Sequence, residues 1–216
     1  MQKRIMYRDL ICIHHCGKKI FTLDQLFNCP LCNKALGVGW DDTPLNLPSP
    51  FIRAVQNPCS IVLRPSGGDF LSSFQNNDDL HIGITSSKGA IVEYDIYGIL
   101  KTPPKADPST DKWNQCLLIA QVSEPWFDWW DEVLEQISTD EKWRKETYDE
   151  NSHNCYSFVL SFLNAVGYSE LSTHCHDRFS FSEKFIVVKT QNAAKYISIY
   201  RKLQIYRYFI DEDCAK

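Results

Sequence analysis

The sequence predicts an α+β protein with a small metal-binding segment at its start. Four of the nine cysteines fall within the first 32 residues, whereas the rest of the chain shows short strand patterns followed by amphipathic helical ones. At 216 residues the chain is long enough for one medium domain with its own core plus a small appendage. We therefore expect a zinc-knuckle-like segment at 1–36, a linker wrapping the main domain at 37–58, and an α+β domain at 59–216.

Composition and charge argue against several classes of function. Apolar residues make up 44% of the chain and aromatic residues 13%, which is typical of a globular protein rather than a disordered one. The formal charge of −4 argues against a broad phosphate-binding surface, so we expect no nucleic-acid partner. No stretch approaches the roughly 18–20 apolar residues that span a bilayer, and the opening residues are too charged for a signal peptide. We therefore expect an intracellular protein, in the cytoplasm, the nucleus or both.

Strand patterns occupy the first half of the main domain. Apolar and other side chains alternate over residues 80–85, as in a half-buried strand. A turn signal at 86–89 separates this run from a second one at 90–97, so the two predict an antiparallel hairpin. Apolar runs at 60–64 and 115–122 predict two further strands.

Helical patterns dominate the second half. Pro125 suits a first helical turn, and an apolar stripe with helical spacing follows it from 126 to 137. Residues 154–165 predict a second helix, which Gly167 would end. Apolar residues within 196–203 predict a third helix. Together with the strands, these patterns predict an antiparallel sheet with packed helices.

Cys29 and Cys32 form the C-x-x-C half of a metal site. Such a turn lets two thiolates face one ion, and the intervening proline helps to fix the turn. A cluster of unligated thiols or a redox pair is the alternative, but a redox pair normally opens a helix and no helical pattern follows here. We favour structural zinc, because four soft ligands leave no open position for chemistry.

The other half of the metal site is less regular. Cys12, His14 and Cys16 would share one face of a strand, with His15 facing away. Cys16-Gly17 resembles the end of a zinc-ribbon knuckle, but the usual partner position three residues earlier is Ile13, which cannot bind metal. Whether Cys12 takes part stays open. The candidate zinc ligands are His14, His15, Cys16, Cys29 and Cys32.

A cysteine at the start of a predicted helix and a histidine on a predicted strand are the candidate catalytic residues. Asn154 suits an N-cap, which places Cys155 in a first turn where free N–H groups favour a thiolate. The thiolate would attack a carbonyl while His81 holds and relays the proton, and the Cys155 N–H could help to bind the oxyanion. Alternatively, Cys155 is an apolar filler of the core and His81 a satisfied structural residue.

The strand motif H-x-G-x and the later helix motif N-C-x-x-F resemble those of circularly permuted papain-like families. These families include the PPPDE peptidases and the lecithin:retinol acyltransferase-like enzymes, in which the histidine strand precedes the cysteine helix. The residues that match are His81, Gly83, Asn154, Cys155 and Phe158. The resemblance implies a permuted papain-like fold and thiol chemistry at Cys155.

Most of the chain also resembles the makorin opposite-strand protein family. The resembling segments are the N-terminal His-Cys and C-P-x-C pieces, residues 81–95 and residues 153–158. This second resemblance bears on the architecture rather than on the chemistry.

The third member of a catalytic set depends on the register of the predicted hairpin. The returning strand carries Glu93, Tyr94 and Asp95. A three-residue loop places Glu93 opposite His81, whereas a four-residue loop places Tyr94 there and turns the carboxylates away. Glu93 is therefore the candidate that would orient His81, with Asp95 as the alternative.

Two functions follow from these observations. The first is a cysteine hydrolase or acyltransferase that uses Cys155, His81 and Glu93 on a peptide, an isopeptide or a thioester/acyl substrate. The second is a non-catalytic adaptor, in which the fold is a protein-interaction module and the zinc segment contacts a partner. Thiol reactivity separates them, because only the enzyme requires a low pKa at Cys155.

Overall fold

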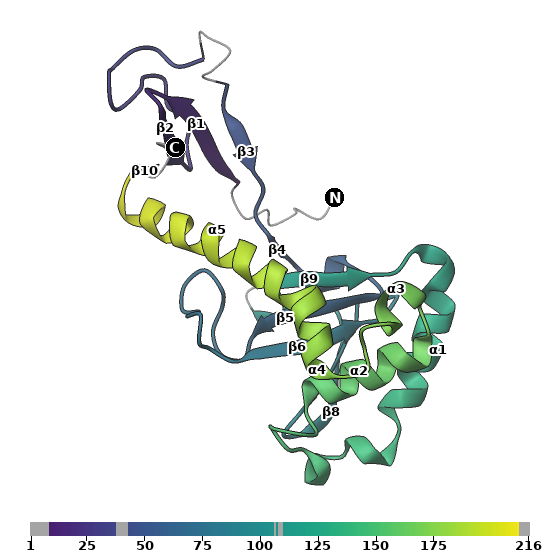
Figure 1. The fold of residues 1–216 in the computed structure, drawn as a ribbon. Helices are drawn as coiled ribbons and strands as arrows, with labels where there is room; N and C mark the ends of the chain where they lie inside the picture. The colour runs from purple at the N-terminus through teal and green to yellow at the C-terminus, as the bar shows by residue number, and fades with distance from the viewer. Residues whose placement is uncertain (1–8, 38–42, 106, 108–109, 212–216) are drawn as a thin grey trace. The chain divides into compact units, whose positions relative to one another are not determined.

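The structure is an α+β protein with two antiparallel sheets, in a computed structural model that describes residues 9–37, 43–105, 107 and 110–211. The chain divides into two compact units, drawn in Figure 1. Unit 1 combines residues 1–50 with residues 193–216, and unit 2 comprises residues 51–192. The segments 1–8, 38–42 and 212–216, which carry parts of the expected knuckle, linker and main domain, lie outside the described residues.

The unit boundaries differ from the expected division at 36 and 58. Strand β3 (Leu45–Leu47), inside the expected linker, pairs with β1 of unit 1. Strand β10 (Tyr208–Asp211), at the end of the expected main domain, pairs with β2 of the same unit. Both pairings join segments far apart in sequence, so no local sequence pattern could predict them.

Unit 1 is built on a four-stranded sheet with the order β10-β2-β1-β3. Strands β1 (Leu10–His15) and β2 (Lys18–Thr22) form a hairpin. Cys16 and Gly17, which connect them, have φ of 54° and 70°. Two successive positive φ values are the geometry of a type I′ turn, which glycine favours at its second position. The small core beneath the sheet contains Ile13, Ile20, Leu26 and Cys29.

Unit 2 contains a six-stranded antiparallel sheet with the order β4-β9-β5-β6-β7-β8. The strand predictions agree with it to within a few residues, although 90–97 holds one whole strand and the turn into the next. The strands are β4 (Phe51–Ile52), β5 (Ser60–Pro65), β6 (Leu80–Thr85), β7 (Ile91–Asp95), β8 (Gly98–Thr102) and β9 (Cys116–Gln121).

The helices follow the strands, as the sequence predicts. The α-helices are α1 (Phe127–Ser138), α2 (Cys155–Val166), α3 (Ser169–Ser172), α4 (Arg178–Phe181) and α5 (Val187–Ile205). Short 3₁₀ turns occur at η2 (Ala54–Gln56), η4 (Glu124–Trp126), η5 (Glu141–Trp143) and η6 (Lys145–Thr147), and η7 (Ser182–Ile186) is a π-helical turn. The third predicted helix lies within α5, which begins nine residues earlier than the predicted apolar pattern.

Helix α2 packs against β6 and β7 and holds the sheet on one face. Its buried residues include Phe158 and Phe162, both fully shielded from solvent. Trp130 of α1 meets the Phe162 ring edge-on, with ring centroids 4.6 Å apart. The predicted stripe on α1 is only partly buried, because Trp129 is 43% exposed. Helix α2 is therefore buried on most sides, between the sheet and α1.

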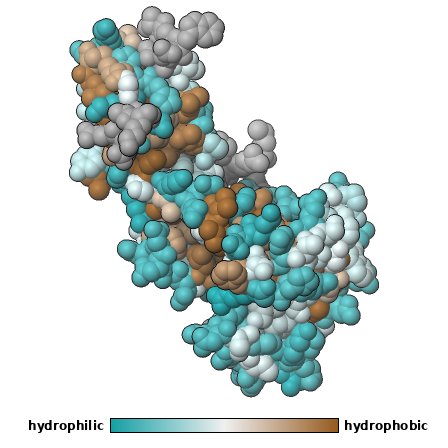
Figure 2. Space-filling view, in the orientation of Figure 1, coloured by the Kyte–Doolittle hydropathy of each residue, from teal (hydrophilic) through white to brown (hydrophobic). Residues whose placement is uncertain are grey.

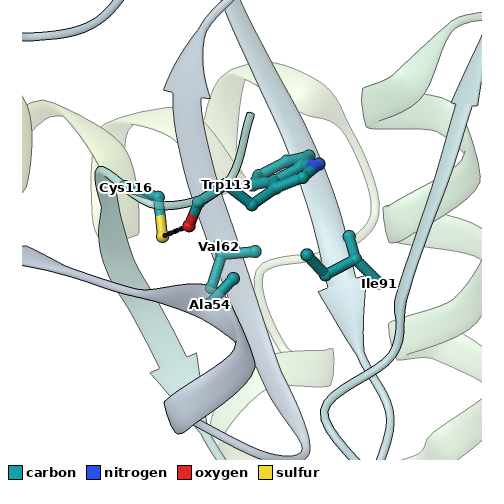
Figure 3. Close-up of a cluster of buried hydrophobic side chains, with 5 residues drawn as sticks. All are labelled: Ala54, Val62, Ile91, Trp113 and Cys116. Atoms are coloured by element: carbon teal, nitrogen blue, oxygen red, sulfur yellow. Dashed lines mark hydrogen bonds between the residues drawn. The ribbon is translucent and has the colours of Figure 1, made fainter. Parts of the chain in front are cut away.

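A second part of the unit 2 core forms around Trp113, beside η2 (Figure 3). Trp113 is 1% exposed and packs with Ala54, Val62, Ile91 and Cys116. The Cys116 thiol donates to the backbone carbonyl of Trp113 at 3.6 Å. In Figure 3 the indole nitrogen points away from Cys116.

The surface is largely polar. Figure 2 shows mostly hydrophilic side chains over the visible face of unit 2. Within the described ranges, no helix combines the length and apolarity needed to cross a membrane.

Candidate functional site

The N-terminus of α2 presents Cys155 in a fixed geometry. The Asn154 side chain accepts from the backbone N–H groups of Tyr156 at 3.0 Å and Ser157 at 3.4 Å. The Ser157 hydroxyl accepts from the Asn154 N–H, which completes a capping box. Asn154 also donates to the Glu150 carbonyl at 2.6 Å. Because both ends of this cap are satisfied, Cys155 is held as the first residue of the helix, as the sequence predicts.

Strands β6 and β7 contribute a histidine and a glutamate to the cluster at Cys155. His81 on β6 is 8% exposed and lies close enough to the Cys155 thiol for each group to shift the pKa of the other. On its other side, Nε2 of His81 lies 2.8 Å from Oε2 of Glu93 on β7. That oxygen lies off the direction of a ring N–H, so the contact is a close ion pair rather than an aligned hydrogen bond.

Glu93 is also held from a second direction. The indole N–H of Trp113 donates to Oε1 of Glu93 at 3.2 Å. Arg64 on β5 places Nη2 3.5 Å from Oε2 and stacks its guanidinium over the Trp113 ring at 5.0 Å. Neither Arg64 nor Trp113 was singled out from the sequence. The only signal was Gly83 in the H-x-G motif, since glycine in a strand often marks a close approach by another group.

The hairpin register differs from both predicted alternatives. Thr85 pairs with Ile91, so five residues connect the strands, instead of three or four. Continued along the strands, this register sets Glu93 opposite Gly83 and diagonal to His81, on the same face of the sheet. The carboxylate therefore reaches His81 across the diagonal. Asp95, the alternative candidate, accepts instead from the Tyr97 N–H in the following turn at 2.7 Å.

The electrostatics of this cluster favour a charged histidine. Burial alone would lower the pKa of His81, but its contacts with Cys155 and Glu93 raise it to about 9. Burial alone would raise the pKa of Glu93, but the facing His81 holds it at about 2. Arg64 and the indole N–H of Trp113 contribute smaller parts of this same lowering of the Glu93 pKa.

The same contacts favour a thiolate at Cys155. Burial alone would raise the pKa of Cys155, yet the His81 contact brings it below its ordinary value. Backbone hydrogen bonding from Ile82 and Tyr156 also lowers the pKa of Cys155. The arrangement can therefore stabilise a thiolate beside an imidazolium, the form in which a cysteine attacks a carbonyl.

Four side chains of unit 1 form a group that could hold a metal ion. Ligand atoms of His15, Cys16, Cys29 and Cys32 all lie within 4.8 Å of one another. Nδ1 of His15 is 3.0 Å from the Cys16 sulfur and 3.7 Å from the Cys32 sulfur. The Leu31 N–H points at the Cys29 sulfur at 3.4 Å, as expected for a C-x-x-C knuckle.

The structure corrects the predicted face of the β1 ligands. Strand alternation placed His14 beside Cys16 and turned His15 away, but His15 is the histidine in the group and His14 is exposed outside it. The alternation fails because Cys16 is already in the turn, with a positive φ that swings its side chain towards His15. Cys12 is buried and lies outside the group.

Comparisons with known proteins identify the family. The model described as DUF4796 N-terminal matches residues 8–36, and the model described as DUF4796 C-terminal matches residues 44–203. The human MKRN2 opposite strand protein is 32% identical over 213 residues, which cover 97% of this chain and 92% of that protein. No solved structure matches the chain significantly. The matches span both units, and the chain therefore belongs to the makorin opposite-strand family, to which the DUF4796 models correspond.

Proposed function

We propose that unit 2 is a cysteine hydrolase or acyltransferase of the permuted papain-like type, with Cys155 as nucleophile, His81 as general base and Glu93 as its orienting carboxylate. One observation carries this proposal. A histidine 2.8 Å from a buried carboxylate also contacts a cysteine that opens a capped helix. The order along the chain, a histidine strand before a cysteine helix, supports the permuted arrangement.

The proposed reaction proceeds through a thioester. The Cys155 sulfur attacks the acyl carbon of the substrate, and the carbonyl π electrons move to the oxygen to give a tetrahedral oxyanion. Collapse expels the amine, alcohol or thiol leaving group, which takes a proton from the His81 imidazolium. His81 then removes a proton from water in a hydrolase, or from an acceptor amine or alcohol in an acyltransferase. That nucleophile releases the acyl group and restores the Cys155 thiolate.

The substrates we expect are peptides, isopeptides and acyl thioesters, because all three offer a carbonyl carbon to a thiolate. The backbone N–H of Cys155, at the α2 N-terminus, is the donor that would help to receive the oxyanion. Glu93 keeps His81 protonated until the leaving group departs, since the carboxylate stabilises the imidazolium.

The first test measures the alkylation rate of Cys155 against pH, resolved by mass spectrometry. We expect fast modification below pH 7 that slows in His81→Ala, because an ion pair supplies the thiolate. Cys175 is an internal control of similar burial, since burial raises the pKa of its thiol to about 11. A Cys155 rate that rises only near pH 8.5 and ignores His81→Ala would contradict the proposal.

The second test traps the covalent intermediate. The native protein is mixed with a simple acyl thioester or activated ester, and acylated Cys155 is sought by mass spectrometry. The proposal requires acylation of the native protein, none at this position in Cys155→Ala, and at least about tenfold slower acylation in His81→Ala.

The burial of the pair favours a second candidate function, a non-catalytic protein-interaction module. Cys155 is 6% exposed and His81 8%, so a substrate needs a local opening to reach the sulfur. In an adaptor, the partner would be another protein and Cys155 would resist alkylation at every pH. The pH series above therefore separates the two functions.

For unit 1 we propose a structural zinc ion held by His15, Cys16, Cys29 and Cys32. Tetrahedral zinc with bonds of about 2.0–2.3 Å sets its ligand atoms roughly 3.5 Å apart, so the group needs only a small contraction. A set of three thiolates and one imidazole is typical of a closed structural site. No disulfide joins the eight cysteines in the described part of the chain, which supports a reducing, intracellular compartment.

Two adjacent histidines test the zinc site. Purified protein should contain about one zinc per chain by elemental analysis. His15→Ala should lose most of it, whereas the matched variant His14→Ala should retain it. Equal zinc content in both variants would exclude His15 as a ligand.

A further inference from the structure

The indole of Trp113 lies where it can control the orientation of Glu93. Trp113 precedes β9 and is fully shielded, and its N–H donates to Oε1 of Glu93 at 3.2 Å. The other carboxylate oxygen, Oε2, faces His81 at 2.8 Å. One donor thus fixes one oxygen, and the second oxygen serves the histidine.

The carboxylate of Glu93 also contacts a second cation, so its orientation depends on more than His81. Arg64 on β5 approaches Oε2 to 3.5 Å and is permanently charged. His81 on β6 is the only other charged side chain found within ion-pair distance of Glu93 among the described residues. The guanidinium of Arg64 is itself anchored, because Nη1 donates to the carbonyls of Pro65 at 2.9 Å and Ser66 at 3.2 Å. Oε2 of Glu93 thus contacts both cations, and the orientation of the carboxylate sets how closely this oxygen approaches His81.

The strand position opposite Glu93 is shaped to admit the indole. A Cβ on Gly83 would lie 2.8 Å from both Cη2 and Cζ2 of Trp113. Such contacts are too short for carbon atoms, so only glycine allows the ring to lie against β6 at this depth. The backbone φ of Gly83 is not in the left-handed region, so its need for glycine comes from this contact alone.

We propose that Trp113 is a positioning residue for the cysteine site: its indole N–H, on a ring that lies against Gly83, holds Oε1 of Glu93 and so keeps Oε2 directed at His81. The proposal rests on the proposed function of Cys155, His81 and Glu93. Trp113 touches neither the thiol nor a substrate, and it acts through the carboxylate.

The decisive experiment measures the pH profile of Cys155 alkylation in Trp113→Phe. Phenylalanine keeps an aromatic ring but removes the donor. A hydrogen bond to a charged group is worth enough to shift a coupled titration by about one pH unit. We therefore expect the profile to move about one unit upward, which is about tenfold slower modification at pH 6.

The same substitution in a Glu93→Gln background separates positioning from packing. If Trp113 acts through the carboxylate, Trp113→Phe should shift the profile no further once Glu93 carries no charge. A shift of equal size in both backgrounds would overturn the proposal, as would no shift in the native background. If native Cys155 titrates as an ordinary thiol, the proposed function and this inference fall together.

Gly83→Ala provides a second test of the proposal if Trp113→Phe does not fold. It leaves the indole intact but displaces it from β6, and it should raise the Cys155 profile in the same direction. Gly67→Ala is the matched control, because a Cβ there meets nothing within 4 Å and its φ is ordinary. A Gly83→Ala protein that folds with an unchanged Cys155 profile would also overturn the proposal.

Discussion

Replacing Glu93 with glutamine should make the free energy of unfolding of unit 2 depend less on pH under acidic conditions. The pKa of Glu93 falls from an ordinary value of 4.5 to about 2, despite burial, because His81 faces it. A carboxyl whose pKa is lowered by folding stabilises the fold above its unfolded pKa, and that stability is lost as pH falls through the folded pKa. Glutamine has the same shape but no charge to lose.

The magnitude follows from the two pKa values. A shift from 4.5 to about 2 corresponds to roughly 3 kcal/mol in full, of which about 2 kcal/mol is lost by pH 3. The raised pKa of His81, about 9, works in the opposite sense: its stabilisation is complete below 6.5 and is lost as pH rises through 9. Both shifts report largely one contact, so their energies are not added.

Urea denaturation followed by tryptophan fluorescence measures this effect. Five of the six tryptophans lie in unit 2, so the signal reports that unit. The stability advantage of the native protein over Glu93→Gln should be largest from pH 5 to 6.5 and should shrink by about 2 kcal/mol at pH 3. Parallel pH curves for the two proteins would show that Glu93 is not paired in solution, and would refute the site geometry.

Three further substitutions test how α2 is held, each by its free energy of unfolding in urea. Asn154→Ala removes both cap hydrogen bonds and should cost about 1–2 kcal/mol, and an unchanged value would show that the cap is not formed. Gly167→Ala should cost about 1 kcal/mol because Gly167 ends α2 with φ of 69°, whereas Gly67→Ala should change little; equal values would contradict the left-handed C-cap. Phe158→Ala should cost about 3–5 kcal/mol, since the ring is fully buried, and a loss below 1 kcal/mol would place it outside the core.

Local sequence patterns predicted the elements but not the division of the chain. The period-2 run of β6 and the capped, glycine-ended α2 both lie close to where their patterns placed them. In contrast, β3 and β10 complete the sheet of unit 1 from segments that the sequence assigned to a linker and to the main domain. Pairing between distant segments depends on tertiary structure, so the sequence pattern of either strand alone does not predict its partner.

A candidate site residue could be predicted from the sequence where the residues around it identify the helix or strand that carries it. Cys155 and His81 were found because a helix start and a strand are locally recognisable. Trp113 was not, because its contact with Glu93 depends on how the segment before β9 returns to the sheet. In unit 1, strand alternation favoured His14 over His15 as the ligand beside Cys16. The alternation of side chains along β1 does not show that the turn already begins at Cys16.

The energetics of the unit 2 cluster fit the chemical role that we propose for it better than a purely stabilising one. Buried ion pairs return little net stability, because desolvation offsets their attraction, and apolar residues of similar volume often do as well. Helix α2 and the sheet already have an apolar contact that includes the fully buried Phe158 and Phe162. The packing of α2 on the sheet therefore does not itself require that a histidine and a glutamate be buried in this cluster. Their measurable product is a lower pKa at one sulfur, a property that a nucleophile needs and a structural thiol does not.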